Sequence, residues 1–113
     1  MPPAHAPFIV TTANEVAGSR VTGYLGVVRG LVVRTPNLGA SILGSLKSIV
    51  GGNISQFATV CEAARQEAFD IMVQHARAVG ADAIIGMRYD ATEFSQNATE
   101  VLAYGTAVRL SPE

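Results

Sequence analysis

The side chains best suited to chemistry are one thiol and one imidazole in the same helical stretch. Cys61 and His75 are 14 residues apart, which corresponds to ~21 Å along a helix. Zinc bonds to sulfur and nitrogen are about 2.0–2.3 Å long. The pair therefore cannot share a metal ion, or act as nucleophile and base, within one subunit. We interpret Cys61 as a small core residue and His75 as a packed or hydrogen-bonded structural histidine.

A metal site requires several subunits. Copies of Cys61 could converge on a symmetry axis and bind a soft heavy-metal ion through their thiolates. This is our alternative hypothesis for the function, and a heavy-metal ion is the cofactor that it implies. Without such convergence we expect no cofactor.

Other constellations predict no catalytic centre. A phosphate-binding loop needs Lys directly after its second glycine, but Ser45 follows Gly44 and Lys47 comes two residues later. Glu67 and Asp70 are one helical turn apart and could suit a hard cation or a partner arginine, but a solvated helix face is the favoured interpretation.

We expect Asp82 to hydrogen-bond the turn that follows the helix. An enzyme remains a third hypothesis, and it would need a shared active site between subunits. Arg77, Asp90 and Glu93 are the residues that could contribute to such a site.

A long helix over residues 55–79 positions most of these groups. We expect Ser55 to be its N-cap and Gly80 its C′ residue, where a positive φ is accessible to glycine. Its second half is strongly polar only at Asp70, Gln74 and Arg77, apart from His75. A polar strip this narrow predicts that the helix packs against its own sheet and against a second subunit.

The remaining pattern predicts an α+β fold, with helices on one side of a mostly antiparallel sheet. The expected strands are residues 8–12, 20–35, 83–92 and 100–110, and a short helix is expected between residues 38 and 49. Glycines at 23, 26 and 30 predict bends, a bulge or close backbone approach. We expect Gly86 and Gly105 to receive the Ala-rich face of the long helix. We expect residues 8–113 to form one domain after a disordered arm at residues 1–7.

Composition excludes some partners and favours self-association. Apolar residues make up 49% of the 113 residues and charged residues 15%, against about 25% charged in an average domain. This charge deficit indicates either an unusually large core or a surface that is buried in an oligomer, and we favour the oligomer. The eight Lys and Arg are spread singly and the net charge is −1, so we expect neither nucleic acid nor a membrane as partner. The N-terminal residues do not resemble a secretory signal, and we expect a cytoplasmic protein.

Four segments carry a family resemblance. They are YLGVVRG, SIVGGNIS, AFDIMVQHARAVGADAIIGMRYD and YGTAV, within Phe8 to Leu110. They resemble the YbjQ-like family, often labelled heavy-metal-binding, whose function is not established. The resemblance implies a fold similar to the dodecin subunit and a ring of five subunits in which short additional strands join neighbours. It transfers no metal ligand to a residue of this chain.

These observations lead to one interpretation. We expect a cytoplasmic homo-oligomer, a homopentameric ring, that acts as a binding or structural module for an unknown small ligand. Its partner is itself. At the subunit junction, the polar side chains expected to contact a ligand are Arg88, Tyr89, Asp90 and Gln96.

Overall fold

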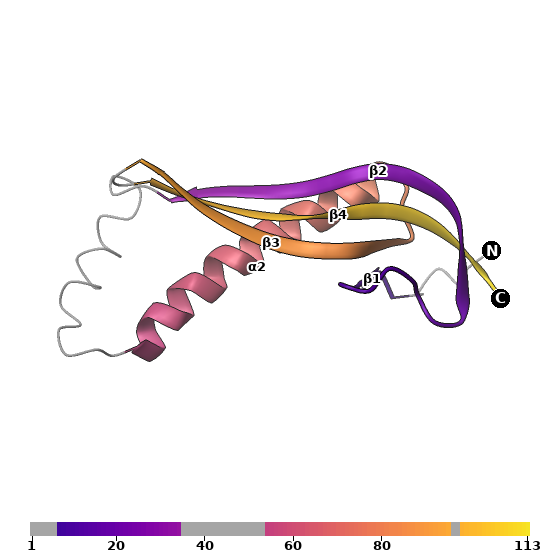
Figure 1. Cartoon of the computed structure of the whole chain (residues 1–113), viewed down its shortest axis with the longest axis horizontal. Coiled ribbons are helices and arrows are strands. Elements are labelled where there is room, and N and C mark those ends of the chain that lie inside the picture. The colour runs from indigo at the N-terminus through magenta and orange to yellow at the C-terminus, as the bar shows by residue number, and fades with distance from the viewer. Residues whose placement is uncertain (1–6, 35–53, 96–97) are drawn as a thin grey trace.

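The computed structural model describes residues 7–34, 54–95 and 98–113. It contains β1 (Ile9–Val10), β2 (Ser19–Arg34), α2 (Ile54–Ala78), β3 (Ala83–Ser95) and β4 (Ala98–Pro112), arranged as in Figure 1. The expected α+β class is confirmed. The short helix expected between residues 38 and 49 lies outside the described residues, as do Gln96 and all of the N-terminal arm except Pro7.

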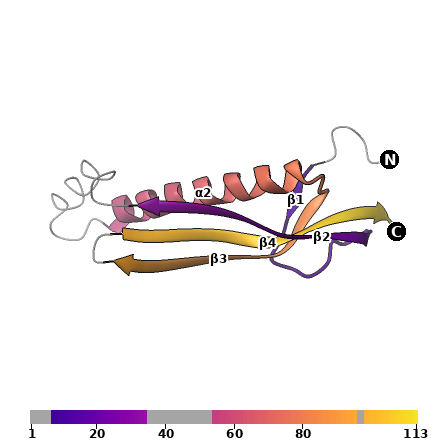
Figure 2. The ribbon, with the colours of Figure 1, turned by 90° about the horizontal axis from the view of Figure 1, so that it is seen from above.

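The four strands form one mixed sheet in the order β1-β3-β4-β2. β4 pairs antiparallel with β2 and with β3, whereas β1 pairs parallel with β3. The sheet is thus mostly antiparallel, as expected, and the parallel pairing of β1 with β3 makes it a mixed sheet. β2 and α2 separate β1 from β3 in the sequence, so no tight hairpin constrains the two strands to run in opposite directions. Figure 2 shows β2, β4 and β3 side by side along one flank of α2.

The end of α2 follows the expectation. Gly80 has a φ of +83°. The Ala81 amide donates to the Ala76 carbonyl at 3.0 Å, and the Gly80 amide donates to the Arg77 carbonyl at 3.1 Å. These two bonds form a Schellman motif, which confirms Gly80 as the C′ residue. The beginning differs by a residue or so, because α2 starts at Ile54 and Ser55 is already helical.

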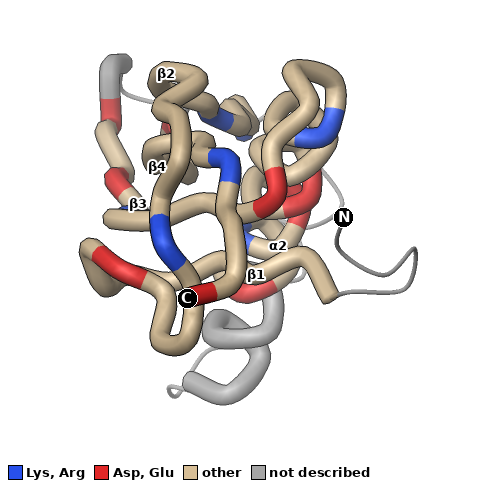
Figure 3. Tube along the Cα trace, turned by 90° about the vertical axis from the view of Figure 1, so that its right-hand side faces the viewer, with Lys and Arg blue, Asp and Glu red and all other residues tan. Residues whose placement is uncertain are grey.

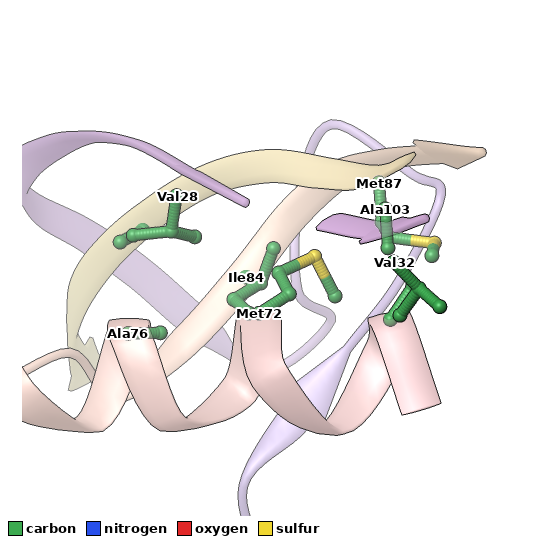
Figure 4. Close-up of a cluster of buried hydrophobic side chains, with 9 residues drawn as sticks. Val28, Val32, Met72, Ala76, Ile84, Met87 and Ala103 are labelled. Atoms are coloured by element: carbon green, nitrogen blue, oxygen red, sulfur yellow. The ribbon is translucent and has the colours of Figure 1, made fainter. Parts of the chain in front are cut away.

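Buried apolar side chains form two clusters on opposite faces of the sheet. The larger cluster lies between α2 and the sheet (Figure 4), and it contains Val28, Val32, Ala68, Met72, Ala76, Ile84, Met87, Ala103 and Ala107. The smaller cluster consists of Val16, Ala83, Ile85 and Val108. Because neighbouring strand residues point to opposite faces, Ile84 and Ile85 belong to different clusters. The segment before β2 thus covers the second face only at one end.

The closest approach of helix and sheet occurs at Gly30. A Cβ atom at this position would lie 2.6 Å from the Met72 nitrogen, and closer still to the Ala68 carbonyl oxygen. The expectation that Gly30 permits close backbone approach is confirmed. The expected bulges also occur, because the pairing of β2 with β4 shifts between Val21 and Gly23 and between Tyr24 and Gly26.

The roles expected for Gly86 and Gly105 were wrong. Gly86 has a φ of +61° and lies where the pairing of β3 with β4 shifts, so it supports a bulge. Its amide donates to the Ala13 carbonyl at 2.8 Å. A Cβ at Gly105 would meet Ile84 and Ile85 of the neighbouring strand instead of the helix. The sequence pattern therefore predicted a close contact correctly at Gly105 but with the wrong element, and at Gly86 no close contact occurs.

We predict that Gly30→Ala lowers the free energy of unfolding by about 3 kcal/mol, because the methyl group overlaps helix backbone that cannot move alone. The matched control is Gly23→Ala in the same strand. A Cβ there would meet Arg109 at an ordinary 3.9 Å. Urea unfolding followed by circular dichroism measures both variants. Equal stability of the two variants would contradict the close approach at Gly30.

Candidate functional site

The three described residues of the expected ligand site do not converge within one subunit. Arg88, Tyr89 and Asp90 are consecutive on β3, so their side chains alternate between the two faces of the sheet. Tyr89 pairs with Ala103, which belongs to the cluster beneath α2. Arg88 and Asp90 therefore lie on the opposite face. A single ligand could contact all three only around the edge of β3.

Arg88 is tied to the backbone. Its Nη1 donates to the carbonyl of Thr12 at 3.0 Å and to that of Met87 at 2.8 Å. The first bond links β3 to the segment that follows β1. Arg88 thus helps to hold the N-terminal segment against the bulge at Gly86.

Tyr89 lies in the most distinctive electrostatic environment among the expected site residues. The guanidinium carbon of Arg65 is 5.7 Å from the centroid of the Tyr89 ring, which is within the range of a cation–π contact. Burial raises the pKa of the Tyr89 phenol above its usual value, and the Glu62 carboxylate raises it further. Arg65 opposes this shift in part. The phenol is thus held in its neutral form.

The residues considered for a shared active site lie apart within the subunit. The guanidinium carbon of Arg77 is 4.8 Å from the centroid of the ring of Phe8, the residue that precedes β1 in the sequence. Asp90 accepts a hydrogen bond from the Ala91 amide at 3.0 Å. Asp90 and Glu93 are three positions apart on β3, so they point to opposite faces.

Cys61 is exposed on α2, and its interpretation as a core residue was wrong. The inward-facing residues of α2 recur every four positions, at Ala64, Ala68, Met72 and Ala76, and Cys61 is not among them. In Figure 1 the beginning of α2 also lies well away from the strands. Within the described ranges, no group of three or more His, Cys, Asp and Glu could hold a metal ion.

His75 has the hydrogen-bonded role that was expected. Its Nδ1 accepts a hydrogen bond from the Arg29 amide at 3.3 Å. An imidazole nitrogen that accepts must be unprotonated, so in this arrangement any ring proton is on Nε2. The partner of His75 could not be found from the sequence, because 46 residues separate the two.

The carboxylates expected on a solvated helix face have protein partners. The Glu67 carboxylate pairs with Arg34 at 2.7 Å, and Asp70 accepts from the Gln66 side chain at 2.9 Å. Both pairs are exposed, which agrees with the expected helix face.

Asp82 differs from its expected role at the turn. Its carboxylate accepts from the Leu110 amide at 2.9 Å and lies 3.5 Å from Arg109. Asp82 therefore joins the end of α2 to β4 instead of closing its own turn.

The feature that the sequence did not locate is an uncovered apolar surface. We call it the open face: the side of the sheet opposite α2, beyond the smaller buried cluster. On β2 it carries Val27, Leu31 and Val33, which are 67%, 49% and 37% exposed. Arg29 and Tyr104 pair across the strands on the same face. The end-on view of Figure 3 shows positive and negative residues on the described elements around the sheet.

Comparison with known proteins assigns the family. The YbjQ family model, described as "Putative heavy-metal-binding", matches residues 8–111. A UPF0145 protein of Chromobacterium violaceum is 56% identical over 104 residues, which cover 92% of this chain and 89% of the relative. A UPF0145 protein of Solibacter usitatus is 53% identical over 103 residues, covering 91% of this chain and 92% of the relative. The chain therefore belongs to the YbjQ family.

A solved structure supports the fold. A Pediococcus pentosaceus protein of unknown function from the DUF74 family superposes with a TM-score of 0.60 at 18% identity. The match covers 92% of this chain and 98% of the other. At this identity the likeness bears on the fold alone. Of the helical segments that the structure describes, none has the length and apolar character needed to cross a bilayer.

We predict that Tyr89 makes the free energy of unfolding fall as the pH rises through the alkaline range. Because the pKa of the folded phenol is raised, the folded protein retains a proton that the unfolded chain releases. This contribution to stability is complete below pH ~10, the usual tyrosine value, and is lost as the pH rises through the raised pKa. Urea unfolding between pH ~9 and ~11.5 should show a steeper loss of stability for wild type than for Tyr89→Phe. Glu62→Gln should give an intermediate slope, and identical slopes for all three proteins would contradict the assignment.

Proposed function

We propose that the protein is a homo-oligomeric binding or structural module, a ring of five subunits with a fold like that of the dodecin subunit, without an active site of its own. The observation that carries this proposal is the open face next to a strand edge that has no strand partner among the described residues. β2 is the last strand of the sheet order, and its exposed side chains on that face include Val27, Leu31 and Val33.

A sheet covered by helices on one side commonly leaves its other side to solvent, but that side is then polar. The open face instead carries aliphatic side chains along the edge strand. Natural proteins protect long edge strands because unpaired amides and carbonyls recruit other strands. β2 has 16 residues, about three times the usual strand length. Contact with another copy would bury the apolar side chains of the open face and pair the backbone amides and carbonyls at the edge of β2.

The free edges of the sheet suit a closed ring. Among the described strands, β2 forms one edge, and β3 from Arg88 onward forms the other, because β1 pairs only with Ala83 and Ile84. A contact between two different surfaces of identical subunits is head-to-tail, and it forms a ring if its rotation closes. The resemblance to the YbjQ-like family supports five as the number of subunits.

A small ligand at the junction is part of the same proposal. Arg88, Tyr89 and Asp90 flank the free edge of β3, and Gln96 follows close behind in the sequence. A neighbouring subunit at this edge would place its own side chains beside both faces of β3. We also propose a cytoplasmic location, which the free thiol of Cys61 supports.

We predict that untagged wild-type protein gives a single species near five subunits in native mass spectrometry, and that Leu31→Lys gives monomers. The substitution places a charge on the open face, where Leu31 is exposed in the isolated chain. The subunit should therefore keep its circular dichroism spectrum. Ala17→Lys adds the same charge in the exposed loop before β2 and should leave the ring intact. A monomeric wild type would refute the proposal.

Soft-metal binding through Cys61 is the second candidate. The exposure of the thiol and the description of the matching family model favour it. Several copies of Cys61 would have to meet at a symmetry axis, because within the described ranges one subunit has no cluster of three ligands. Thiolates are the ligands that soft ions prefer.

We predict for this candidate that Cd²⁺ binds the assembled protein with less than one ion per subunit. Cys61→Ser should abolish binding, whereas His75→Asn, which leaves the thiol in place, should preserve it. Isothermal titration calorimetry under reducing conditions measures both. Undiminished binding by Cys61→Ser would eliminate the candidate.

A further inference from the structure

His75 lies where α2 meets the free edge of β2. Its Nδ1 accepts the Arg29 amide at 3.3 Å, three residues before the helix ends at Ala78. Both side chains are exposed. This is a hydrogen bond from an edge-strand backbone donor to a helix side chain, and it joins the two elements outside their buried cluster.

The bond identifies which amides of β2 face the free edge. In an antiparallel ladder, successive residues direct their N–H and C=O groups alternately toward the paired strand and away from it. Pairing of β2 with β4 is regular from Gly26 to Arg34. Because the Arg29 amide is turned toward α2, the amides of Leu31 and Val33 are turned to the same free edge. Their side chains also lie on the open face.

We propose that His75 is a positioning residue for strand addition, an inference that rests on the proposed assembly. Because the Arg29 amide already donates to His75, it cannot donate to an added strand. The amides of Leu31 and Val33 remain able to pair with a strand of a second copy. An unrestricted edge could pair in registers that differ by two residues, since such a slip keeps every side chain on its face. A closed position at Arg29 removes that freedom.

Charge complementarity points to β3 of the second copy as the added strand. β2 carries Arg20, Arg29 and Arg34 and no carboxylate, and of these Arg34 already pairs with Glu67 of α2. The free part of β3 after Arg88 carries Asp90 and Glu93 and no basic residue. Opposite charges on adjacent strands are stabilising, whereas like charges are not. An added β2 would oppose arginine with arginine, so the pairing of β2 with β3 is favoured.

The first test isolates the hydrogen bond from the assembly. Amide hydrogen exchange is measured by NMR in the Leu31→Lys variant, whose subunits are expected to be separate. Adding His75→Ala should accelerate exchange of the Arg29 amide about tenfold, the effect of losing one hydrogen bond. Adding His75→Asn should restore protection, because Oδ1 can accept at the position of Nδ1. Unchanged exchange in the His75→Ala double variant would overturn the role of His75.

The second test asks whether the bond sets the register. With Leu31 restored, His75→Ala should give more than one stoichiometry in native mass spectrometry, whereas His75→Asn should give the single species of wild type. A single unchanged stoichiometry for His75→Ala would overturn the positioning role while leaving the ring in place. A monomeric wild type would instead refute the assembly on which the inference rests. The three results are therefore distinguishable.

Discussion

The structure depends on the close approach of α2 to β2 at Gly30. The Ala68 carbonyl and the Met72 amide occupy the space that a side chain would need at this position. Val28 and Val32, on either side of Gly30, are buried against the helix. This contact fixes α2 over β2 and β4, at one side of the sheet instead of its centre. The position of the helix in turn decides which surfaces of the sheet remain uncovered.

Two polar links flank the contact at Gly30 and follow from the same geometry. Glu67 binds Arg34 toward one end of the contact, and His75 binds the Arg29 amide toward the other. Residue numbers rise along α2 as they fall along β2, so the two elements run in opposite directions. Exposed bonds of this kind each contribute little to stability, about 1 kcal/mol or less. Their main effect is on geometry. The buried residues determine that α2 packs against β2, and the two polar links fix the orientation of the helix along that strand.

Local patterns predicted the elements well, and non-local contacts explain the errors. The end of α2 followed from Gly80, whose φ and Schellman bonds are a local matter. The parallel pairing of β1 could not be derived, because it joins segments separated by a strand and a helix. At the candidate site, the sequence placed Arg88, Tyr89 and Asp90 on one strand. It could not show that Tyr89 lies beside Arg65, since that contact depends on where α2 crosses the sheet.

The arrangement of the sheet also separates the candidate site residues within one subunit. Within the described ranges, the groups able to do chemistry are separated by the sheet itself: Arg88 and Asp90 on the open face, Tyr89 beside α2. A sheet is one layer thick, so residues on its two faces meet only around an edge. The edge of β3 that they share has no strand partner in the described part of the subunit. A molecule that uses all three residues must therefore reach around that edge, and under the assembly that we propose it would meet a neighbouring chain there.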